Sequence, residues 1–266
     1  MVGDVRYTTD WTNVTSLDGC GQIARVPGGG NLMQSVNFNL VGSPGMSVAA
    51  FGSADGLRWH WLGVAAFPVD LPAPHIGASE TGLAILPDGS ALIVIRTGNG
   101  FHTHNPLFST RSTSRPLGTS WDKPAPMTGG LGSSVGPFGV RPNLLVVTAH
   151  TAAPLLLLST GRPGLFLWVS KDNGLEWTPL NLAAAHNDGM EPVEHFSAAC
   201  MHASVQGPGA AESTAYTSLV GGGVGGADAV VCYDKLAHGW FGPSAKQHDA
   251  VYCMPLWVGG TVGEMG

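Results

Sequence analysis

The sequence predicts an all-β protein assembled from a repeated unit of about 50 residues, as in a propeller or a solenoid. Three observations lead to this prediction: a turn motif that recurs along the chain, a high content of turn-forming residues, and no convincing long amphipathic helix. The 266 residues include 39 Gly and 19 Pro, and only 11% of them are charged. Such a composition is typical of short strands connected by tight turns.

The recurring motif is clearest in residues 170–177, which read SKDNGLEW. Asp and Asn side chains accept hydrogen bonds from nearby backbone N–H groups, and Gly adopts a positive φ without steric cost, so the stretch predicts a turn. The apolar run at residues 164–169 predicts the strand before this turn. Trp177 begins the strand after it, with a large ring to bury.

Three further copies of the motif can be identified. Residues 53–59, SADGLRW, keep the Ser, Asp, Gly and Trp, whereas residues 114–121, SRPLGTSW, have Pro in place of the Asp. Residues 8–14, TTDWTNV, keep only a hydroxyl and the Asp. At the resulting spacing the chain makes about five units, and no linker divides residues 1–266 into more than one domain.

Strand-like runs fill the intervals between these turns. We expect strands at residues 31–40, 46–52, 59–66, 82–86, 90–96, 143–149, 154–160, 164–169, 196–205, 213–220, 227–233 and 250–256. Pro87, Asp88 and Gly89 predict a tight turn that joins two of them into a hairpin.

Charge and composition argue against several functional classes. The formal net charge of −6, without basic clusters, argues against a nucleic-acid partner. No apolar run approaches the roughly 18 residues of a membrane span. The glycine-rich residues 221–226 lie between two strands rather than in a βαβ unit, and His102 and His104 have no further ligands nearby, so we expect neither cofactor nor metal. The first ten residues show no signal peptide, which leaves the compartment open.

The four cysteines have no metal-ligand spacing. Cys232 and Cys253 lie in strand-like runs and could face each other on paired strands, whereas Cys20 and Cys200 have no evident partner. A disulfide and buried free thiols both remain open, and the sequence favours free thiols.

The recurring turn resembles the Asp-box of the sialidase (neuraminidase) superfamily, whose members are six-bladed β-propellers. The resemblance implies a six-bladed-type sialidase propeller with one blade incomplete. In that family the box is a folding element on the outer rim, between the third and fourth strands of a blade. It therefore implies that Asp172 stabilises a turn and Trp177 packs, and that neither residue takes part in chemistry.

A sparse order of polar residues also resembles that of sialidases. Glu80 is followed sixteen residues later by Arg96, and Arg162 precedes the Ser170 of a box by eight residues. Tyr216 lies on a late strand-like run, and the next run, AVVCYD, ends in Tyr and an acid. The resemblance extends from about residue 50 to residue 256.

The resemblance implies a retaining exo-α-sialidase that acts on sialylated glycans or related acidic sugars. Arg96 and Arg162 would hold the sugar carboxylate, because a planar guanidinium matches a carboxylate in bidentate fashion; Arg141 competes with Arg162 for this role. Tyr216 would be the nucleophile, since a carboxylate would be repelled by this substrate. A phenol is weak at neutral pH, so Glu80 would be its base. The alternative is a non-catalytic propeller that binds glycans or a protein partner.

Two parts of the sialidase pattern have no clear match. Arg25, followed by Val26 and Pro27, resembles the Arg-Ile-Pro motif that carries the third carboxylate-binding arginine, but no Asp or Glu lies between it and Ser53 to act as the acid. Alternatively, residues 8–14 close a first blade whose earlier strands lie upstream. We favour this second interpretation, a sialidase-type chain without its N-terminal portion, with Asp10 as a fallback acid. A secreted or lysosomal location would then be expected.

Overall fold

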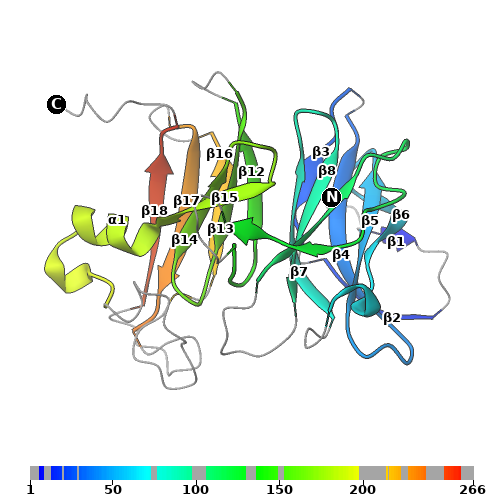
Figure 1. The fold of residues 1–266 in the computed structure, drawn as a ribbon, viewed down its shortest axis with the longest axis horizontal. Helices are drawn as coiled ribbons and strands as arrows, with labels where there is room; N and C mark the ends of the chain where they lie inside the picture. Colours follow the sequence, from blue (N-terminus) through cyan, green and yellow to red (C-terminus); the bar gives the residue numbers. More distant parts are fainter. Residues whose placement is uncertain are drawn as a thin grey trace. The chain divides into compact units, whose positions relative to one another are not determined.

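The structure is a computed structural model (Figure 1), and it describes most of the chain. The described residues are 6–8, 13–19, 21–28, 30–72, 77–97, 106–129, 136–148, 153–197, 214, 216–222, 227–237 and 249–258. They belong to two compact units: unit 1 comprises Met1–Gly100 and Asn105–Met127, and unit 2 comprises Phe101–His104 and Thr128–Gly266. The described part of each unit contains two sheets, so the predicted all-β class is confirmed.

The first sheet of unit 1 has the strand order β1-β6-β5-β4-β2, and β3 also pairs with β4. Its strands are β1 (Arg6–Thr8), β2 (Val14–Asp18), β3 (Ile23–Arg25), β4 (Leu32–Leu40), β5 (Ser47–Ser53) and β6 (Arg58–Ala66). All seven residues of β5 are buried, because neighbouring strands cover both edges and side chains pack on both faces. The run SVAAFGS accordingly shows no apolar–polar alternation: small residues dominate, Val48 and Phe51 are large and apolar, and its only polar residues are the serines at its two ends.

The second sheet of unit 1 has the order β10-β9-β8-β7. It contains β7 (Ala78–Ile85), β8 (Ala91–Thr97), β9 (Phe108–Ser112) and β10 (Ala125–Pro126), and the 3₁₀ helix η1 (Pro68–Asp70) precedes it. Met33 and Val48 of the first sheet share one buried cluster with Ile93 and Phe108 of the second. The predicted hairpin turn is present, since Gly89 N–H donates to Leu86 O (2.9 Å) between β7 and β8.

The first sheet of unit 2 has the order β11-β15-β14-β13-β12. Its strands are β11 (Thr128–Gly129), β12 (Asn143–Val147), β13 (Leu155–Thr160), β14 (Phe166–Ser170) and β15 (Glu176–Asn181). The helix α1 (Leu182–Gly189) and the 3₁₀ helix η2 (Pro192–Glu194) follow β15. The Asn181 side chain caps α1 by accepting a bond from Ala184 N–H (3.0 Å).

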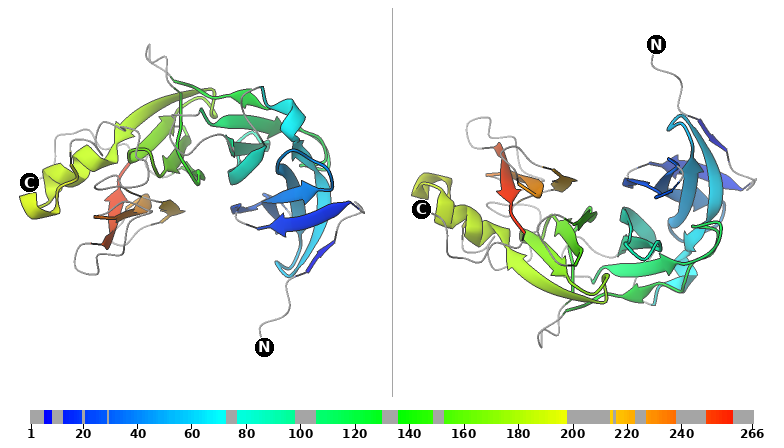
Figure 2. Two further views of the ribbon diagram at one scale, coloured as in Figure 1. Left: turned by 90° about the horizontal axis from the view of Figure 1, so that it is seen from below. Right: turned by 90° about the horizontal axis from the view of Figure 1, so that it is seen from above.

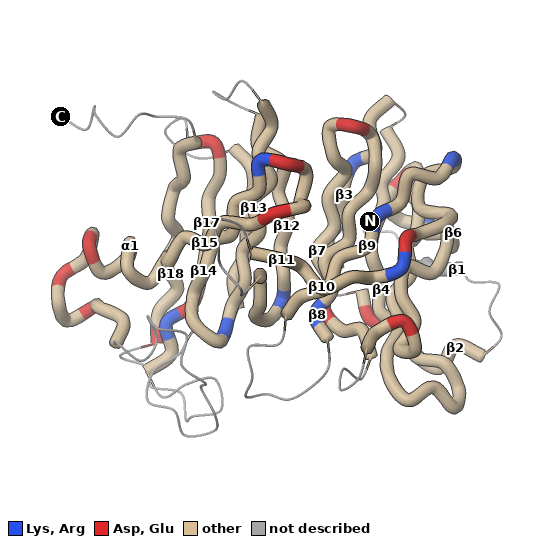
Figure 3. The backbone as a smooth tube through the Cα atoms, viewed as in Figure 1, with Lys and Arg blue, Asp and Glu red and all other residues tan. Residues whose placement is uncertain are grey.

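The second sheet of unit 2 has the order β16-β17-β18, with β16 (Thr217–Gly221), β17 (Ala229–Lys235) and β18 (Ala250–Leu256). Exposure alternates along the edge strand β18, so that Val251 and Cys253 are exposed while Tyr252 and Met254 face the core. Helix α1 lies beside β18 in Figures 1 and 2. The ring of His186 on this helix packs edge-on against that of Tyr252 on β18, with 4.7 Å between the ring centroids. Figure 3 shows that charged residues lie mostly at strand ends and in loops.

Most predicted strands are confirmed to within a few residues, including the strand expected to begin at Trp177 (β15), whereas six described strands were missed: β1, β2, β3, β9, β10 and β11. Several of these have only two or three residues, and β9 is largely polar, so none presents a long apolar pattern. The strand expected at residues 196–205 falls mostly outside the described residues. Chain length predicted about five units, and the described residues form four sheets.

The possible fourth copy of the turn, residues 8–14, begins at the last residue of β1 and ends at the first residue of β2. The strands that flank them, β1 and β2, belong to the same sheet as β4, β5 and β6. Residues 9–12 themselves, including the fallback acid Asp10, lie outside the described residues.

The turn at residues 170–177 is stabilised by side-chain bonds to its own backbone. Ser170 Oγ accepts from Gly174 N–H (2.8 Å) and donates to Asp172 Oδ1 (2.7 Å). The same Oδ1 accepts the N–H groups of the two residues after Gly174, at 3.2 and 3.0 Å. Trp177 Nε1–H then donates to Gly174 O (3.2 Å), and Gly174 has φ 88°. The motif residues therefore satisfy the main chain of the turn, as the sequence predicted.

The turn at residues 53–59 repeats this arrangement. Gly56 N–H donates to Ser53 Oγ (2.9 Å), and Asp55 Oδ1 accepts the next two N–H groups, both at 2.8 Å. Trp59 Nε1–H again donates to the glycine carbonyl (3.1 Å). Both turns connect the strands of an antiparallel pair, β5 with β6 and β14 with β15.

The third copy begins two residues earlier than the sequence suggested. Gly118 N–H donates to Ser112 Oγ (3.0 Å), so Ser112 and not Ser114 takes the role of the motif serine. Ser114 Oγ accepts the N–H groups of the two residues after Gly118, at 3.1 and 3.3 Å, which is the role of the Asp in the other copies. Trp121 closes the turn with a bond to Gly118 O (2.9 Å). Two extra residues that include Pro116 obscured this alignment.

The prediction that Cys232 and Cys253 are free thiols is wrong. These residues face each other in the register of β17 and β18, and their sulfurs form a disulfide across 21 residues of sequence. The pairing depends on the register of two strands, which the sequence alone left open.

Replacing Asp172 with Ala should lower the free energy of unfolding by about 1–2 kcal/mol, because two backbone N–H groups lose a charged acceptor. Partial burial raises the pKa of Asp172, but hydrogen bonds from Glu176 N–H, Ser170 and Leu175 N–H outweigh it and hold the pKa below 3.8. A lowered folded-state pKa means that this stabilisation is present above pH 3.8 and is lost as the pH falls through the lowered value. Urea denaturation of wild type, Asp172→Ala and the exposed-site control Lys171→Ala, at neutral and at acid pH, would measure the free energy of unfolding. An equal loss at neutral and acid pH would contradict the assignment.

Reduction of the Cys232–Cys253 disulfide should lower the free energy of unfolding by about 3 kcal/mol, since the unfolded chain is no longer constrained by the 21-residue loop. Thermal denaturation with and without a dithiol reductant measures the change. The double variant Cys232→Ser/Cys253→Ser should abolish the response to the reductant, and Cys20→Ser/Cys200→Ser should retain it. The opposite pattern would place the disulfide elsewhere.

Candidate active site

Two main-chain hydrogen bonds in unit 2 join the loop before β12 to the turn after β13. Val140 N–H donates to Arg162 O (3.1 Å), and Gly161 N–H donates to Val140 O (3.0 Å). A Cβ at position 139 would lie 2.6 Å from Gly161 O, so this approach requires Gly139, which also has φ 114°. As a result, Arg141 lies close to Arg162 although the two are far apart in the sequence.

Tyr216 lies next to both arginines. The guanidinium carbon of Arg162 is 5.0 Å from the centroid of the Tyr216 ring, and that of Arg141 is 5.4 Å from it. Arg162 is buried and Arg141 is exposed. The Tyr216 side chain is 38% exposed, so a ligand can reach its ring. Both contacts have cation–π geometry. Two positive charges beside an accessible phenol form a site suited to an anion, and the fork of a guanidinium suits a carboxylate.

Side-chain bonds hold β16 against the first sheet of unit 2. The Asn143 side-chain amide donates to Thr217 O (2.9 Å) and to Arg141 O (2.8 Å). Thr217 Oγ1 donates to Ser159 Oγ (3.0 Å) on β13. Tyr216 directly precedes Thr217. The bonds from Asn143 to Thr217 O and to Arg141 O therefore place the Tyr216 main chain close to that of Arg141.

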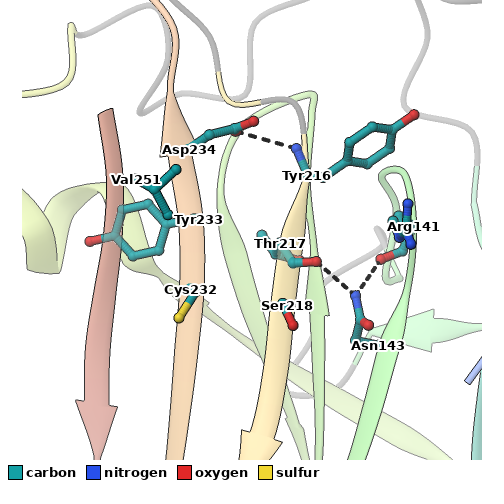
Figure 4. A pocket seen from close by; sticks show the side chains of 9 residues that line it. All are labelled: Arg141, Asn143, Tyr216, Thr217, Ser218, Cys232, Tyr233, Asp234 and Val251. Carbon is teal, nitrogen blue, oxygen red and sulfur yellow. Dashed lines mark hydrogen bonds between the residues drawn. The ribbon is translucent and has the colours of Figure 1, made fainter. Parts of the chain in front are cut away.

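A cavity of about 330 Å³ opens beside Tyr216 (Figure 4). Figure 4 shows the Tyr216 ring extending toward Arg141 and away from β17. The cavity wall is mainly polar near the arginine and includes apolar groups toward β18. Its lining residues are Arg141, Asn143, Tyr216, Thr217, Ser218, Cys232, Tyr233, Asp234 and Val251.

Tyr233 also lines this cavity, but its hydroxyl is committed elsewhere. His186 Nε2 lies 2.9 Å from the carbonyl of Glu194, which can only accept, so Nε2 carries the proton and Nδ1 accepts from Tyr233 Oη (3.0 Å). Burial raises the pKa of Tyr233 to about 12. Tyr233 therefore stays neutral, and Tyr216 is the tyrosine of this cavity that a substrate can reach.

Glu80 and Arg96 form an ion pair in unit 1. Glu80 Oε2 accepts from Arg96 NH1 at 2.8 Å, and the two side chains are 15% and 21% exposed. They lie on β7 and β8, and Glu80 falls at an irregularity in the pairing register between Ala78 and Thr81. Such bulges redirect side chains out of the regular alternation. The sixteen-residue spacing in the sequence thus corresponds to a contact across a hairpin.

Of the remaining candidates, the structure describes only Arg25. Arg25 is exposed at the end of β3, opposite Leu32 in the register with β4. His102 and His104 lie outside the described residues. Within the described residues, no group of three or more metal-ligating side chains is present. Nor is any helix among them long and apolar enough to span a membrane.

Sequence reasoning missed three polar residues of the site: Asn143, Thr217 and Asp234. Asn143 is the first residue of the apolar strand β12. A polar residue in such a strand needs a hydrogen-bond partner, so the sequence did indicate that Asn143 makes a tertiary contact. Thr217 resembles any other strand threonine. Asp234 belonged to the Tyr-acid pattern, but nothing local indicated which group it contacts.

Comparison with solved structures identifies the fold. The Hadza microbial sialidase Hz136 matches with a TM-score of 0.54 at 16% identity, over 94% of this chain and 39% of that one. The Penicillium chrysogenum α-L-arabinanase complexed with arabinobiose matches with a TM-score of 0.53 at 16% identity, over 85% of this chain and 54% of that one. The Trypanosoma rangeli sialidase in complex with the inhibitor DANA matches with a TM-score of 0.52 at 16% identity, over 84% of this chain and 30% of that one.

A scan against protein-family models gives no match, and neither does a search of curated proteins. The chain spans 39%, 54% and 30% of the length of the three solved structures. Their structural similarity agrees with the fold that the resemblance of the turn motif implied. The chain has the fold of the sialidase-like β-propeller glycoside hydrolases.

Proposed function

We propose that this protein is a retaining exo-α-sialidase-type glycoside hydrolase that removes a terminal sialic acid, or a related nonulosonic acid, from glycans. One observation carries the proposal: the guanidinium groups of Arg141 and Arg162 both lie beside the accessible ring of Tyr216, at a cavity in unit 2. The site thus combines a cationic environment with a phenolic nucleophile.

The substrate class follows from the charge of the site. Sialic acids carry a carboxylate on the anomeric carbon, next to the bond that is cleaved. Arg141 and Arg162, which competed for one role in the sequence, can both contact such a carboxylate because they lie beside the same ring. Arg96 completes the proposed set of carboxylate-binding arginines.

In the proposed reaction, the phenolic oxygen of Tyr216 attacks the anomeric carbon and the aglycone departs with the electron pair of the glycosidic bond. Glu80 takes the phenolic proton. Water then attacks the same carbon and displaces the phenolate, which takes back its proton from Glu80, while the proton released by the water neutralises the departed aglycone oxygen through solvent. An uncharged nucleophile avoids the repulsion that a carboxylate would meet at this substrate.

Glu80, Arg141 and Tyr216 occupy similar places within their own sheets. Each lies at or just before the beginning of an edge strand: Glu80 in β7, Arg141 before β12 and Tyr216 before β16. Propeller blades surround a central channel, where such positions recur from blade to blade. We therefore propose that residues 1–266 form one sialidase-like propeller domain.

The repeated turns are, in this proposal, the Asp-boxes of the propeller. In the first sheet of each unit the turn joins the last two strands of an antiparallel run, β5 with β6 and β14 with β15. Their Ser, Asp and Trp side chains are occupied by bonds to the turn itself. They are folding elements without a chemical role.

Replacing Tyr216 with Phe should abolish hydrolysis of a fluorogenic aryl α-sialoside, with a loss of at least about 10³-fold in kcat. A phenolic leaving group departs without much help from an acid, so this substrate tests the nucleophile alone. Release of the fluorophore by purified wild type and variant is the measurement. A folded wild type that binds the sugar without turnover would favour the non-catalytic, glycan-binding propeller.

The role of Glu80 is tested by the same assay. Glu80→Gln should lower kcat by about 10²–10⁴-fold, and the double variant Glu80→Gln/Tyr216→Phe should be no slower than Tyr216→Phe alone. Such non-additivity is expected only if the base acts through the nucleophile. Multiplicative losses would show that Glu80 and Tyr216 act independently.

Replacing Arg141 or Arg162 with Ala should raise the KM for the aryl sialoside by about 10-fold or more, because each loses a charge-assisted hydrogen bond to the carboxylate. Arg162→Lys should recover only part of the loss, since lysine keeps the charge without the bidentate fork. The control Arg115→Ala removes an arginine of the third turn and should leave the KM unchanged. An unchanged KM in both site variants would exclude them from carboxylate binding.

A further inference from the structure

The backbone of Tyr216 is held differently from the strand that follows it. The ladder between β16 and β17 begins at Thr217, which pairs with Tyr233, so Tyr216 lies one residue before the first pair. Its side chain is 38% exposed and is therefore not enclosed by packing. The position of the phenol accordingly depends on what holds the main chain at this residue, in addition to the two arginines beside the ring.

The carboxylate of Asp234 contacts this main chain. Asp234 Oδ1 accepts a hydrogen bond from Tyr216 N–H at 3.3 Å and another from Thr214 Oγ1 at 2.9 Å. Thr214 is fully buried, so its hydroxyl offers a well-fixed donor. One carboxylate oxygen thus holds residues on both sides of position 215. Hydrogen bonds to a charged acceptor are stronger than those between neutral groups.

Asp234 acts on the backbone of Tyr216 rather than on its phenol. In Figure 4 the carboxylate faces the Tyr216 nitrogen, while the ring extends in the opposite direction, toward Arg141. The carboxylate is therefore oriented to place the nucleophile and not to take its proton.

Asp234 is itself held by its neighbours on β17. Successive residues of a strand point to opposite faces, so Tyr233 enters the buried face, where its hydroxyl bonds to His186 (3.0 Å). On the same face as Asp234, Cys232 is bonded covalently to Cys253 of β18. The strand that carries the carboxylate is thus anchored on both faces of the sheet.

We infer that Asp234 is the positioning residue for Tyr216: its carboxylate fixes the main chain from which the proposed nucleophile extends into the cavity. The structural part of this inference, that Asp234 fixes the Tyr216 main chain, rests on the hydrogen bonds alone. The catalytic part, that this placement speeds hydrolysis, rests on the proposed function. A displacement of about 1 Å at a reacting group can cost about 10²-fold in rate, so a residue that fixes the backbone has a measurable effect.

Amide hydrogen exchange tests the structural part without any need for activity. The chain has four tyrosines, so labelling with ¹⁵N-tyrosine gives four amide signals, and Tyr216→Phe assigns the one of interest. In Asp234→Ala the Tyr216 amide should exchange at least about 10-fold faster, because it loses its acceptor, while the Tyr252 amide keeps its rate. Asp234→Asn keeps an oxygen acceptor and should restore most of the protection. An unchanged Tyr216 rate in Asp234→Ala overturns the inference.

Kinetics with the aryl sialoside test the catalytic part. Asp234→Ala should lower kcat by about 10–100-fold while KM changes by less than about threefold, since the arginines still bind the carboxylate. Asp234→Asn should restore most of kcat. A variant Asp234→Asn as slow as Asp234→Ala would mean that the negative charge matters rather than the placement, and would overturn the inference. If wild type shows no turnover, the proposed function fails, and the exchange measurement still decides the structural part.

Thr214→Val provides a second variant if Asp234→Ala does not fold. It removes one of the two donors to the carboxylate with little change in volume, and the Tyr216 amide should then exchange several-fold faster than in wild type. An unchanged rate in this variant contradicts the shared-acceptor arrangement.

Discussion

The main-chain contact between Val140 and the turn at Gly161 and Arg162 is the interaction on which the candidate site depends. Its two hydrogen bonds join segments that are separated by the whole of β12 and β13, and they require glycine at position 139. The contact places Arg141 close to Arg162, so that both guanidinium groups lie beside one phenol. These main-chain hydrogen bonds thus bring two positive charges together, and two guanidinium groups bind an anion more strongly than one arginine alone would.

Strand β17 shows how one element serves both stability and the site. Tyr233 points into the core of unit 2 and bonds to His186, while the next residue, Asp234, faces the cavity and holds the backbone at Tyr216. Burial keeps the first of these tyrosines neutral, and partial exposure leaves the other accessible. The period of two along β17 thus places the structural Tyr233 on one face of the strand and Asp234, which contacts the backbone of the proposed nucleophile, on the other.

Local patterns predicted much of the fold and part of the site. The turn residues Asp55 and Asp172 could be assigned from sequence because each satisfies backbone groups only a few residues away. The spacing of Glu80 and Arg96 led to separate roles for the two residues, and their ion pair across a hairpin was not foreseen from it. The third turn was recognised but aligned two residues too late, because a serine takes the place of the aspartate and two extra residues are present.

The sequence by itself determined the all-β class, the turns and the presence of most strands, since these follow from residue type and from contacts over a few residues. Only the tertiary structure decided that Cys232 bonds to Cys253, that Arg141 accompanies Arg162 instead of replacing it, and that Asp234 contacts the backbone of Tyr216. Each of these depends on the register of paired strands or on a meeting of distant loops. Such contacts form only when many main-chain hydrogen bonds are satisfied together, and no short stretch of sequence contains that information.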